Sequence, residues 1–192
     1  MNYLAHAFLS NNNKDLLVGN FIADHLRGND FKNYPPQIVE GIYLHRKIDT
    51  FTDAHPQFKA SKRLFYEGFE KYSGVLVDIY FDHLLARDFN RYSKMSLKQF
   101  SKNVYLQYVE AKTWLPQTSV RFLDYVIKGD VYTSYASLEG IERVLFHLSQ
   151  RINHPHVHLD HSIALFKEHA KQLSENFASF FGEAIQQFMD PS

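Results

Sequence analysis

Apolar residues return every three or four positions along almost the whole chain, which is the spacing of one face of an α-helix. The clearest case is residues 161–189, where the apolar stripe predicts one long amphipathic helix. Similar stripes predict helices over residues 14–28, from Pro36 to a break at residues 53–56, and over 57–72, 75–92, 96–112, 119–128 and 137–152. No segment sustains the alternation of a strand, so the pattern predicts an all-α fold.

Several of these helix boundaries carry signals of their own. Pro36 suits a first helical turn, where its missing backbone N–H costs nothing, and Gly28 is a typical helix stop. Ser96 and Ser137 stand where a helix is expected to begin, because a serine hydroxyl accepts a hydrogen bond from the first turn. No internal repeat and no long linker interrupts the chain, so we expect residues 1–192 to form a single-domain helical bundle.

The composition is that of a globular protein and narrows the range of chemistry. Of 192 residues, 45% are hydrophobic and 22% charged, and the formal net charge is zero, so nothing global points to nucleic acid or to a membrane as a partner. The chain has no cysteine, which excludes disulfides and thiolate metal sites and fits a reducing compartment. Without a signal-peptide pattern or a long apolar run, we expect a cytoplasmic protein.

Polar residues interrupt the apolar faces in a repeated pattern. In GIYLHRKIDTFTDAHP, residues 41–56, the side chains of His45, Asp49 and Asp53 follow one another at intervals of four. Four residues advance a helix by about 400°, so these side chains share one face. Other pairs with the same spacing are Asn2 and His6, Asn20 and Asp24, and Asp78 and Asp82, the last followed directly by His83.

These carboxylates stand among apolar neighbours, such as Phe21 and Ile22 beside Asp24. A buried carboxylate is costly unless it is paired, hydrogen-bonded or bound to a cation. Helical bundles build metal sites from the inward side chains of facing helices, and a set of Asp and His donors without sulfur suits Mn²⁺, Mg²⁺, iron or Zn²⁺. Taken together, the polar pairs predict a metal site.

Each of these residues also has an ordinary structural interpretation. His6 is compatible with a hydrogen-bonded histidine of the core, and Asn20 with a side chain bonded to nearby backbone. Asp78 fits a partly solvated helix, Asp53 a helix end, and Arg46 an exposed ion pair. A helical binding module, whose polar pairs only specify packing, therefore stays open as a non-enzymatic alternative.

A second cluster, HPHVHLDH at residues 154–161, holds four histidines and an aspartate. His154, His156 and His158 are two residues apart and do not share a helical face. Tracts of this kind can bind metal adventitiously. We interpret this one as an exposed loop between two helices rather than as the active site.

Five segments together resemble the acyl carrier protein phosphodiesterases, also called holo-acyl-carrier-protein hydrolases. They are MNYLAH at residues 1–6, GNFIADHLRG at 19–28, the motif at 41–56, DIYFDHLLARDF at 78–89 and YASLEGIERVLFHLSQR at 135–151. The resemblance spans essentially the whole chain. It implies an HD-domain-like helical fold, because this family is regarded as a divergent relative of the HD-type metal-dependent phosphohydrolases.

The resemblance implies an activity as well. Members of this family remove the 4′-phosphopantetheine arm from holo-acyl carrier protein, typically with Mn²⁺ or Mg²⁺, and yield the apo-protein and 4′-phosphopantetheine. We expect Mn²⁺ as the cofactor, with Mg²⁺ or Fe²⁺ as alternatives. A nucleotide or another small phosphoester is an alternative substrate for the same chemistry. Two departures stand out: Asp82-His83 reverses the His-Asp order that names the wider superfamily, and Phe89 stands where the family has tryptophan.

The resemblance also implies roles for the polar residues, since a divalent cation activates water and neutralises charge on the phosphoryl oxygens of an inert diester. The metal ligands expected under it are Asp24, His45, Asp49 and Asp82. The residues expected to orient these ligands or the water are His6, Asn20, Asp53 and Asp78. We expect Arg46 and Arg143 to bind phosphate oxygens, and His83 to protonate the departing serine oxygen of the carrier protein.

A cationic span begins shortly after Asp82-His83. Its members, interrupted by the single acid Asp88, are Arg87, Arg91, Lys94, Lys98 and Lys102. Residues 87 and 91 are four apart, as are 94, 98 and 102, so each set is expected to line a helical face. An ordinary solvated surface is the alternative interpretation. Because acyl carrier proteins are acidic, we expect this span to be the surface on which holo-acyl carrier protein docks.

Overall fold

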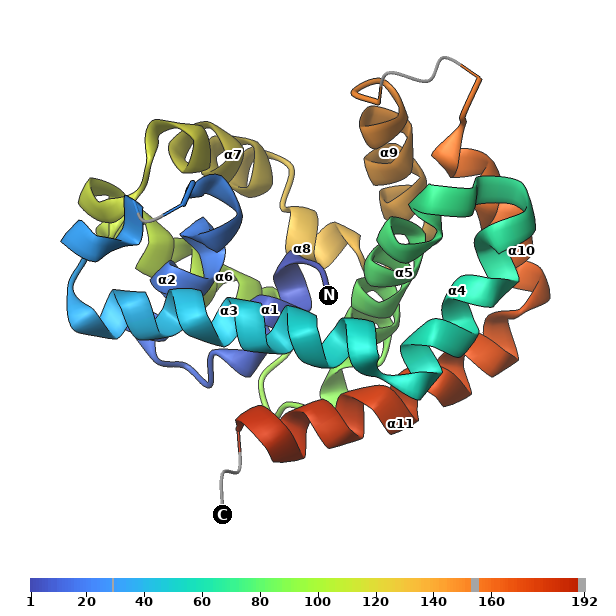
Figure 1. Ribbon diagram of the computed structural model, residues 1–192, viewed down its shortest axis with the longest axis horizontal. Coiled ribbons are helices and arrows are strands. Elements are labelled where there is room, and N and C mark those ends of the chain that lie inside the picture. Colours follow the sequence, from blue (N-terminus) through green and yellow to red (C-terminus); the bar gives the residue numbers. More distant parts are fainter. Residues whose placement is uncertain (29, 153–155, 190–192) are drawn as a thin grey trace.

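The computed structural model describes residues 1–28, 30–152 and 156–189, which fold into α-helices and short 3₁₀ turns (Figure 1). No strand occurs in these residues, which confirms the all-α prediction. The helices are α1 Tyr3–Leu9, α2 Lys14–Ile22, α3 Pro36–Ala54, α4 Pro56–Phe69, α5 Ser73–Arg87, α6 Leu97–Glu110, α7 Gln117–Lys128, α8 Val131–Ser134, α9 Leu138–Ser149, α10 Ser162–Glu168 and α11 Ala170–Phe188. The 3₁₀ turns are η1 Ala23–His25, η2 Asp30–Asn33, η3 Glu70–Tyr72, η4 Phe89–Arg91, η5 Lys112–Trp114 and η6 Leu159–His161. None of the helices in these ranges is both long enough and apolar enough to cross a membrane.

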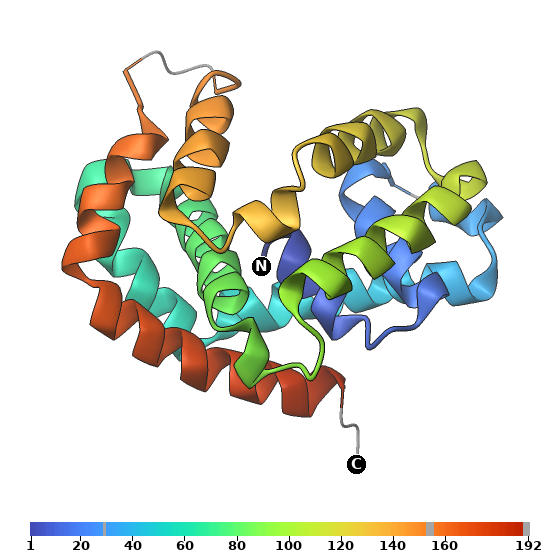
Figure 2. The ribbon, with the colours of Figure 1, turned by 180° about the vertical axis from the view of Figure 1, so that it is seen from behind.

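Helix α3 runs across the molecule and organises the other helices around it (Figure 1). Helices α2, α6 and α7 gather at its N-terminal end, whereas α4, α5, α9 and α10 gather at its C-terminal end. Seen from behind, α1 and α8 lie between these two groups, and α11 runs along one edge of the molecule (Figure 2). The first residues of the chain are therefore placed in the middle of the molecule, close to α3.

Several helix boundaries agree with the sequence signals. Helix α3 begins at Pro36, and the break after it is a single residue, His55, whose Nδ1 accepts a hydrogen bond from the Gln57 N–H. Ser96 and Ser137 accept hydrogen bonds from the first turns of α6 and α9. These contacts confirm that the proline and the two serines mark helix starts.

Other boundaries differ from the predictions. Helix α2 ends at Ile22, several residues before Gly28, because the chain tightens into η1 and then extends at Leu26. Helix α5 ends at Arg87 rather than near residue 92. The long helix predicted over 161–189 is divided at His169, where φ is −101° and ψ is 15°. Both halves, α10 and α11, pack against α4, and the bend between them makes this possible.

Aromatic side chains dominate the core between α4, α5 and α11. The ring of Phe81 on α5 lies 6.0 Å from Phe58, 5.3 Å from Phe177 and 5.2 Å from Phe180, measured between centroids. Phe89, just beyond the end of α5, is 2% exposed and packs edge-on against Phe8. This packing fixes α5 firmly against the rest of the bundle.

Candidate metal centre and its cleft

Two glycines set the distance between α2 and α3. A Cβ added to Gly19 would lie 2.8 Å from the Cα of Gly41, and one added to Gly41 would lie 2.9 Å from the Cα of Gly19. Side chains do not tolerate approaches that close, so any larger residue would push the two helices apart. The contact places Asn20, the next residue of α2, beside His45, which is one turn further along α3.

The amide of Asn20 has only one orientation that satisfies its neighbours. Its Nδ2 donates to the carbonyl oxygen of His6 at 3.0 Å and to Ser10 Oγ at 3.1 Å. Because a carbonyl oxygen cannot donate, the amide nitrogen must face it and Oδ1 must point the other way. There Oδ1 lies 2.8 Å from Nδ1 of His6 and 2.9 Å from Nδ1 of His45. One buried oxygen is thus shared by two imidazoles.

The shared oxygen determines which nitrogen of each imidazole carries a proton. Asn20 Oδ1 can only accept hydrogen bonds, so both rings donate to it from Nδ1. In a neutral ring this leaves the lone pair on Nε2, which is then free to bind a metal ion. The rings of His6 and His45 are buried and stack with their centroids 4.2 Å apart. Asn20 therefore presents two Nε2 atoms side by side.

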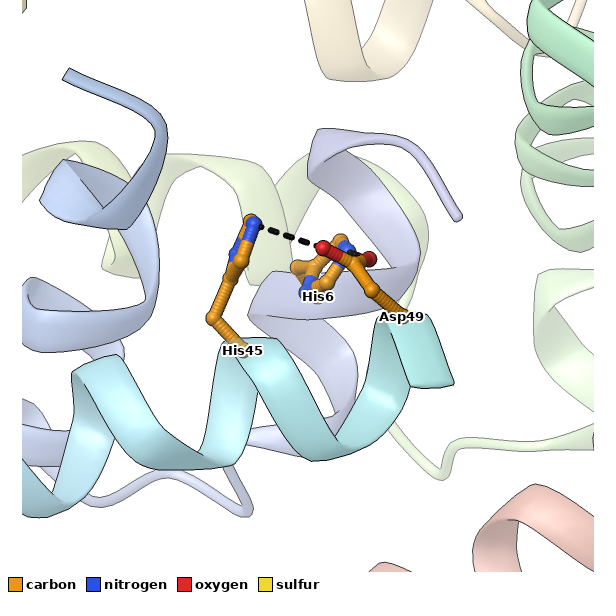
Figure 3. A group of neighbouring side chains, drawn as sticks. All are labelled: His6, His45 and Asp49. Carbon is orange, nitrogen blue, oxygen red and sulfur yellow. Dashed lines mark ion pairs between the residues drawn. The ribbon is translucent and has the colours of Figure 1, made fainter. Parts of the chain in front are cut away.

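Two carboxylates face these nitrogens. Asp49 Oδ1 lies 3.2 Å from His6 Nε2, and Asp49 Oδ2 lies 3.1 Å from His45 Nε2 (Figure 3). Asp24, on η1, places Oδ1 3.0 Å from the same nitrogen of His45. The side chains of Asp49 and Asp24 are 43% and 54% exposed, so the carboxylates form the solvent side of the group and the imidazoles its buried side.

Burial and the two carboxylates compete for the protons of the group. Burial opposes a charge on His45, but the hydrogen bonds to Asp24 and Asp49 outweigh it and raise the pKa of His45 to about 9. Burial lowers the pKa of His6 to about 4, although the carboxylate of Asp49 beside its Nε2 acts in the other direction. Burial also opposes ionisation of Asp49, yet its contacts with the two imidazoles hold the pKa of Asp49 well below the usual range. The carboxylate is ionised at neutral pH, as a metal ligand must be.

These residues fit a divalent cation. Three ligand atoms lie within 4.8 Å of one another, one from each of His6, His45 and Asp49. A cavity of about 20 Å³ adjoins them, lined in part by both imidazoles, Asn20 and Asp24, and is large enough for one ion or water. Within the described part of the chain, His6 Nε2 is buried and has no hydrogen-bond partner of good geometry. A mixed set of imidazole and carboxylate donors is typical of Mn²⁺, Fe²⁺ and Zn²⁺ sites.

A cleft of about 320 Å³ opens next to this group. Asp24 and residues 1–3 line both the cleft and the small cavity, so the two spaces adjoin. The remaining walls come from α5, α7, α8 and α9, and most of their side chains are apolar or aromatic. A substrate held in the cleft would therefore reach the group of His6, His45 and Asp49 from its exposed, carboxylate side.

The α-amino group of Met1 is buried between the carboxylates at the edge of the site. Its nitrogen lies 2.9 Å from Asp78 Oδ1 and 3.9 Å from Asp49 Oδ1. Burial opposes its charge, but Asp78 and Asp49 outweigh this and raise the pKa of the amino group. The structure therefore brings Asp78 to the cleft, where it lines the wall. Asp53, one turn beyond Asp49, is exposed, and its negative charge is one of the causes that raise the pKa of Asp78.

Asp82 lies outside this group, although it was expected among the ligands. It is 0% exposed, and its two oxygens accept the backbone N–H groups of Leu4 at 2.8 Å and Ala5 at 3.0 Å. These are N–H groups of the first turn of α1, which have no partner within their own helix. Asp82 thus closes the N-terminal end of α1 and fixes the helix that carries His6. Burial raises the pKa of Asp82 to about 7, against the two N–H groups that act to lower it.

The structure also directs three other predicted residues away from the cation group. The Nδ1 of His83, 3% exposed, lies 2.7 Å from the backbone oxygen of Tyr135, so this ring anchors α5 to the residue that follows α8. Arg46 is exposed and stacks over Phe31, its guanidinium 5.0 Å from the ring centroid, beside a different groove. Arg143 is exposed on α9 and does not line the cleft.

Two cleft residues with basic side chains, His147 and Arg151, were not singled out from the sequence. Both line the cleft from the end of α9, one and two turns beyond Arg143. The signal was present, since Arg143, His147 and Arg151 form a row at intervals of four. Spacing alone does not tell which turn of such a row reaches the site.

The cationic span is divided between different elements. Arg87 ends α5 and pairs with Asp88 at 2.7 Å, and Arg91 lies 3.9 Å from the same acid. Lys94 precedes α6, so residues 94, 98 and 102 do not form one helical row. Lys98 and Lys102 are on α6 and line a groove of about 400 Å³ together with exposed apolar residues.

The histidine tract lies partly within the described residues. His154 falls outside them. His156 and His158 are exposed and precede η6, which agrees with the interpretation of the tract as a loop. The rings of His158 and His161 stack with centroids 5.0 Å apart. Within the described chain, the group of His, Asp and Glu side chains close enough to hold a cation is that of His6, His45 and Asp49.

Comparison with known proteins agrees with the motifs. The family model of the acyl carrier protein phosphodiesterases matches residues 1–184. The chain belongs to this family. Curated proteins named acyl carrier protein phosphodiesterase from Salmonella agona (strain SL483) and Salmonella newport (strain SL254) are each 33% identical over 156 residues, which is 79% of this chain and 79% of each relative. No solved structure matches, so the expected likeness to HD domains stays a prediction.

Proposed function

We propose that this protein is a divalent-cation-dependent phosphodiesterase that hydrolyses holo-acyl carrier protein to the apo-protein and 4′-phosphopantetheine. Membership of the acyl carrier protein phosphodiesterase family supports the activity, because the curated relatives are named for it. The observation that carries the metal part of the proposal is the bridge at Asn20. Its single oxygen fixes the tautomers of His6 and His45, so that both Nε2 atoms meet Asp49.

In this proposal each residue has a task that arises from its contacts. His6, His45 and Asp49 hold the cation, and Asp24 adds a further carboxylate oxygen beside His45. Bound Mn²⁺, or alternatively Mg²⁺ or Fe²⁺, would supply charge neutralisation at the phosphoryl oxygens and activation of water. Asn20 keeps the protons on the Nδ1 atoms, and Asp82 holds α1, and with it His6, in register.

The reaction needs one water and leaves two products. The oxygen of water bonds to phosphorus, the bond between phosphorus and the serine oxygen of the carrier protein breaks, and a proton ends on that serine oxygen. The open side of the candidate site suits such an attack, because Asp49 and Asp24 are half exposed while the imidazoles are buried. An enclosed site would admit a small ester but not a prosthetic group that is still attached to a protein.

Docking of the carrier protein is the second part of the proposal. We assign it to the α6 groove, where Lys98 and Lys102 stand next to Leu106 and Val109, which are 52% and 49% exposed. An acidic protein with apolar contact residues complements this surface. Helix α7 separates the groove from the cleft, because Ile127 lines the groove and Tyr125 lines the cleft.

The experiment that tests the activity is mass spectrometry of holo-acyl carrier protein incubated with this protein and Mn²⁺. We expect the carrier protein to lose the mass of the phosphopantetheinyl group, and a chelator to stop the loss reversibly. His45→Ala should stop it as well, and should also remove Mn²⁺ binding in calorimetry. Glu40→Ala, an exposed acid on α3, is the matched control and should do neither. If the protein hydrolyses members of a nucleotide panel but leaves the phosphopantetheinyl group on the carrier protein, the substrate is instead a small phosphoester.

Docking is tested by charge reversal on α6. Lys98→Glu combined with Lys102→Glu should raise the KM for holo-acyl carrier protein, and the difference from the unchanged protein should shrink as salt screens the charges. Lys59→Glu combined with Lys167→Glu reverses two exposed lysines of α4 and α10 and serves as the control. A KM unchanged by the α6 reversals would place the docking surface elsewhere.

A further inference from the structure

We propose that the cleft beside the metal group receives the phosphopantetheine arm, with Arg151 binding its phosphate and the apolar wall of α5 and α9 holding the pantetheine chain. The inference rests on the proposed function and deepens it, since it names the residues that recognise the arm. It also replaces Arg46 and Arg143, the two phosphate-binding residues expected from the sequence.

Arg151 shares the cleft with Asp24, the carboxylate at the edge of the metal group. Tyr3 lines the same cleft. The phenol of Tyr3 feels both charges: burial raises the pKa of Tyr3, the carboxylate of Asp24 raises it further, and the guanidinium of Arg151 acts to lower it. Arg151 and Asp24 therefore line, with Tyr3, one cleft between residues 1–3 and α9, and a phosphate held in that cleft beside Asp24 is within the surroundings of Arg151.

The charge of Arg151 is available to a ligand. The residue is exposed at the end of α9, and no carboxylate of the described chain forms an ion pair with it. A guanidinium offers two parallel N–H groups to a phosphate, and such paired bonds are strong and directional. By contrast, Arg46 stacks on Phe31 beside another groove, and Arg143 stands outside the cleft. Arg151 is thus the arginine placed to meet the phosphate of the substrate.

The apolar wall suits the part of the substrate that is attached to the phosphate. Val75 and Ile79 of α5 face the cleft, as do Val144 and Leu148 of α9. A pantetheine chain carries a dimethyl-substituted carbon and several methylene groups, and it has no charge of its own. Burying these groups against aliphatic side chains is favourable by about 25 cal/mol per Å². The volume of about 320 Å³ is in the range of a pocket for a single small-molecule group.

The role of Arg151 is tested with the free arm. In calorimetry with Mn²⁺ present, Arg151→Ala should weaken binding of 4′-phosphopantetheine about tenfold or more, because a hydrogen-bonded ion pair is lost. Binding of pantetheine, which lacks the phosphate, should not change. Arg151→Lys should restore part of the affinity. Arg143→Ala removes the same charge two turns away in the same row, outside the cleft, and should leave binding unchanged.

The apolar wall is tested by filling it. Val75 is 40% exposed at the start of α5, so Val75→Trp adds bulk inside the cleft without disturbing the core. We expect Val75→Trp to abolish binding of both compounds and to raise the KM for holo-acyl carrier protein at least tenfold, with Mn²⁺ affinity intact. Val75→Ala, which keeps the cleft open, should bind both compounds.

The outcomes separate this inference from the proposed function. Suppose that the wild-type protein removes the arm from holo-acyl carrier protein, and that Arg151→Ala and Val75→Trp match it in binding of 4′-phosphopantetheine and in KM. The cleft assignment is then overturned, and the activity stands. If the unchanged protein neither removes the arm nor binds 4′-phosphopantetheine, both fail. If Arg151→Ala weakens the binding of nucleotides but not that of 4′-phosphopantetheine, the assignment is overturned in favour of a nucleotide ligand.

Discussion

Helices α3 and α5 carry almost the same polar pattern, and the fold gives it two different environments. On α3, His45 and Asp49 stand one turn apart, and on α5, Asp78 and Asp82 do the same. Asp49 is partly exposed and faces two imidazoles. Asp82 is fully buried and accepts two backbone N–H groups of α1. Spacing tells which side chains share a helical face, but the element packed against that face decides what the side chains do.

The difference can be stated as a difference of partners. A carboxylate beside imidazole nitrogens and solvent can exchange these contacts for a cation without leaving a buried group unpaired. A carboxylate that closes the end of a buried helix cannot, because the N–H groups it leaves have no other acceptor nearby. The α3 row is therefore suited to binding, whereas the inner carboxylate of α5 is suited to holding the fold.

The largest expected effect belongs to the α3 row. His45→Ala and Asp49→Ala should each lower turnover of holo-acyl carrier protein by orders of magnitude and abolish Mn²⁺ binding in calorimetry, with the helical circular dichroism spectrum unchanged. Asn20→Ala, which frees both tautomers, should lower Mn²⁺ affinity about 10- to 100-fold. Near-normal turnover of His45→Ala and Asp49→Ala at saturating Mn²⁺ would remove the metal site from this helix.

A smaller effect, and of another kind, is expected on α5. Asp82→Ala should lower the free energy of unfolding by about 1–3 kcal/mol, measured with urea in the presence of a chelator, because two buried N–H groups lose their acceptor. Asp49→Ala should change this metal-free stability much less, since its side chain is 43% exposed. If Asp82→Ala has normal stability but does not bind Mn²⁺, Asp82 is a metal ligand after all.

The two carboxylates should also give stability opposite dependences on pH in the metal-free protein. The pKa of Asp82 is raised from 3.8 to about 7 in the fold, so its contribution is complete below about pH 4 and is lost as pH rises towards 7. The pKa of Asp49 is lowered, so its contribution is present above about pH 4 and is lost on acidification. Urea unfolding across this pH range should show that Asp82→Asn removes the fall in unfolding free energy between about pH 4 and 7. Asp49→Asn should remove the fall on acidification below about pH 4. Equal slopes in both variants would contradict the assignment.

The smallest effect is expected at the other histidine cluster. Replacing His154, His156 and His158 together with alanine should leave turnover and stability close to those of the unchanged protein, because His156 and His158 are exposed and outside the cation group. Adventitious binding of Ni²⁺ or Zn²⁺ should fall in the same variant. Loss of turnover in a folded triple variant would move the active site to residues 154–161.

The fold was predictable wherever a local signal was sufficient. Helical periodicity and the residues that begin helices, such as Pro36 and Ser137, depend on contacts within one turn, so the sequence contains them. The end of α2 and the break at His169 were missed, because both arise where a helix adapts to its neighbours. A continuous apolar stripe is compatible with one straight helix and with two bent ones.

The same distinction applies to the candidate site. The spacing of His45 and Asp49 identified a pair that the structure brings together with His6. It could not identify the shared oxygen of Asn20, which depends on how closely α2 approaches α3, or the cap that Asp82 provides. Arg151 was overlooked for Arg143 because helical spacing places both on one face, and only the packing of α9 tells which turn lines the cleft.

The contact between Gly19 and Gly41 bears on which ions the site accepts. With the backbones touching, α2 and α3 cannot shift relative to one another, so Asn20 keeps its place beside His45, and its hydrogen bonds to His6 hold the second imidazole. Asp49 and Asp24 are held less tightly, since both side chains are about half exposed and Asp24 stands on a short 3₁₀ turn. Ions of different radius would therefore be accommodated by movement of the carboxylates, while the nitrogen atoms keep their places.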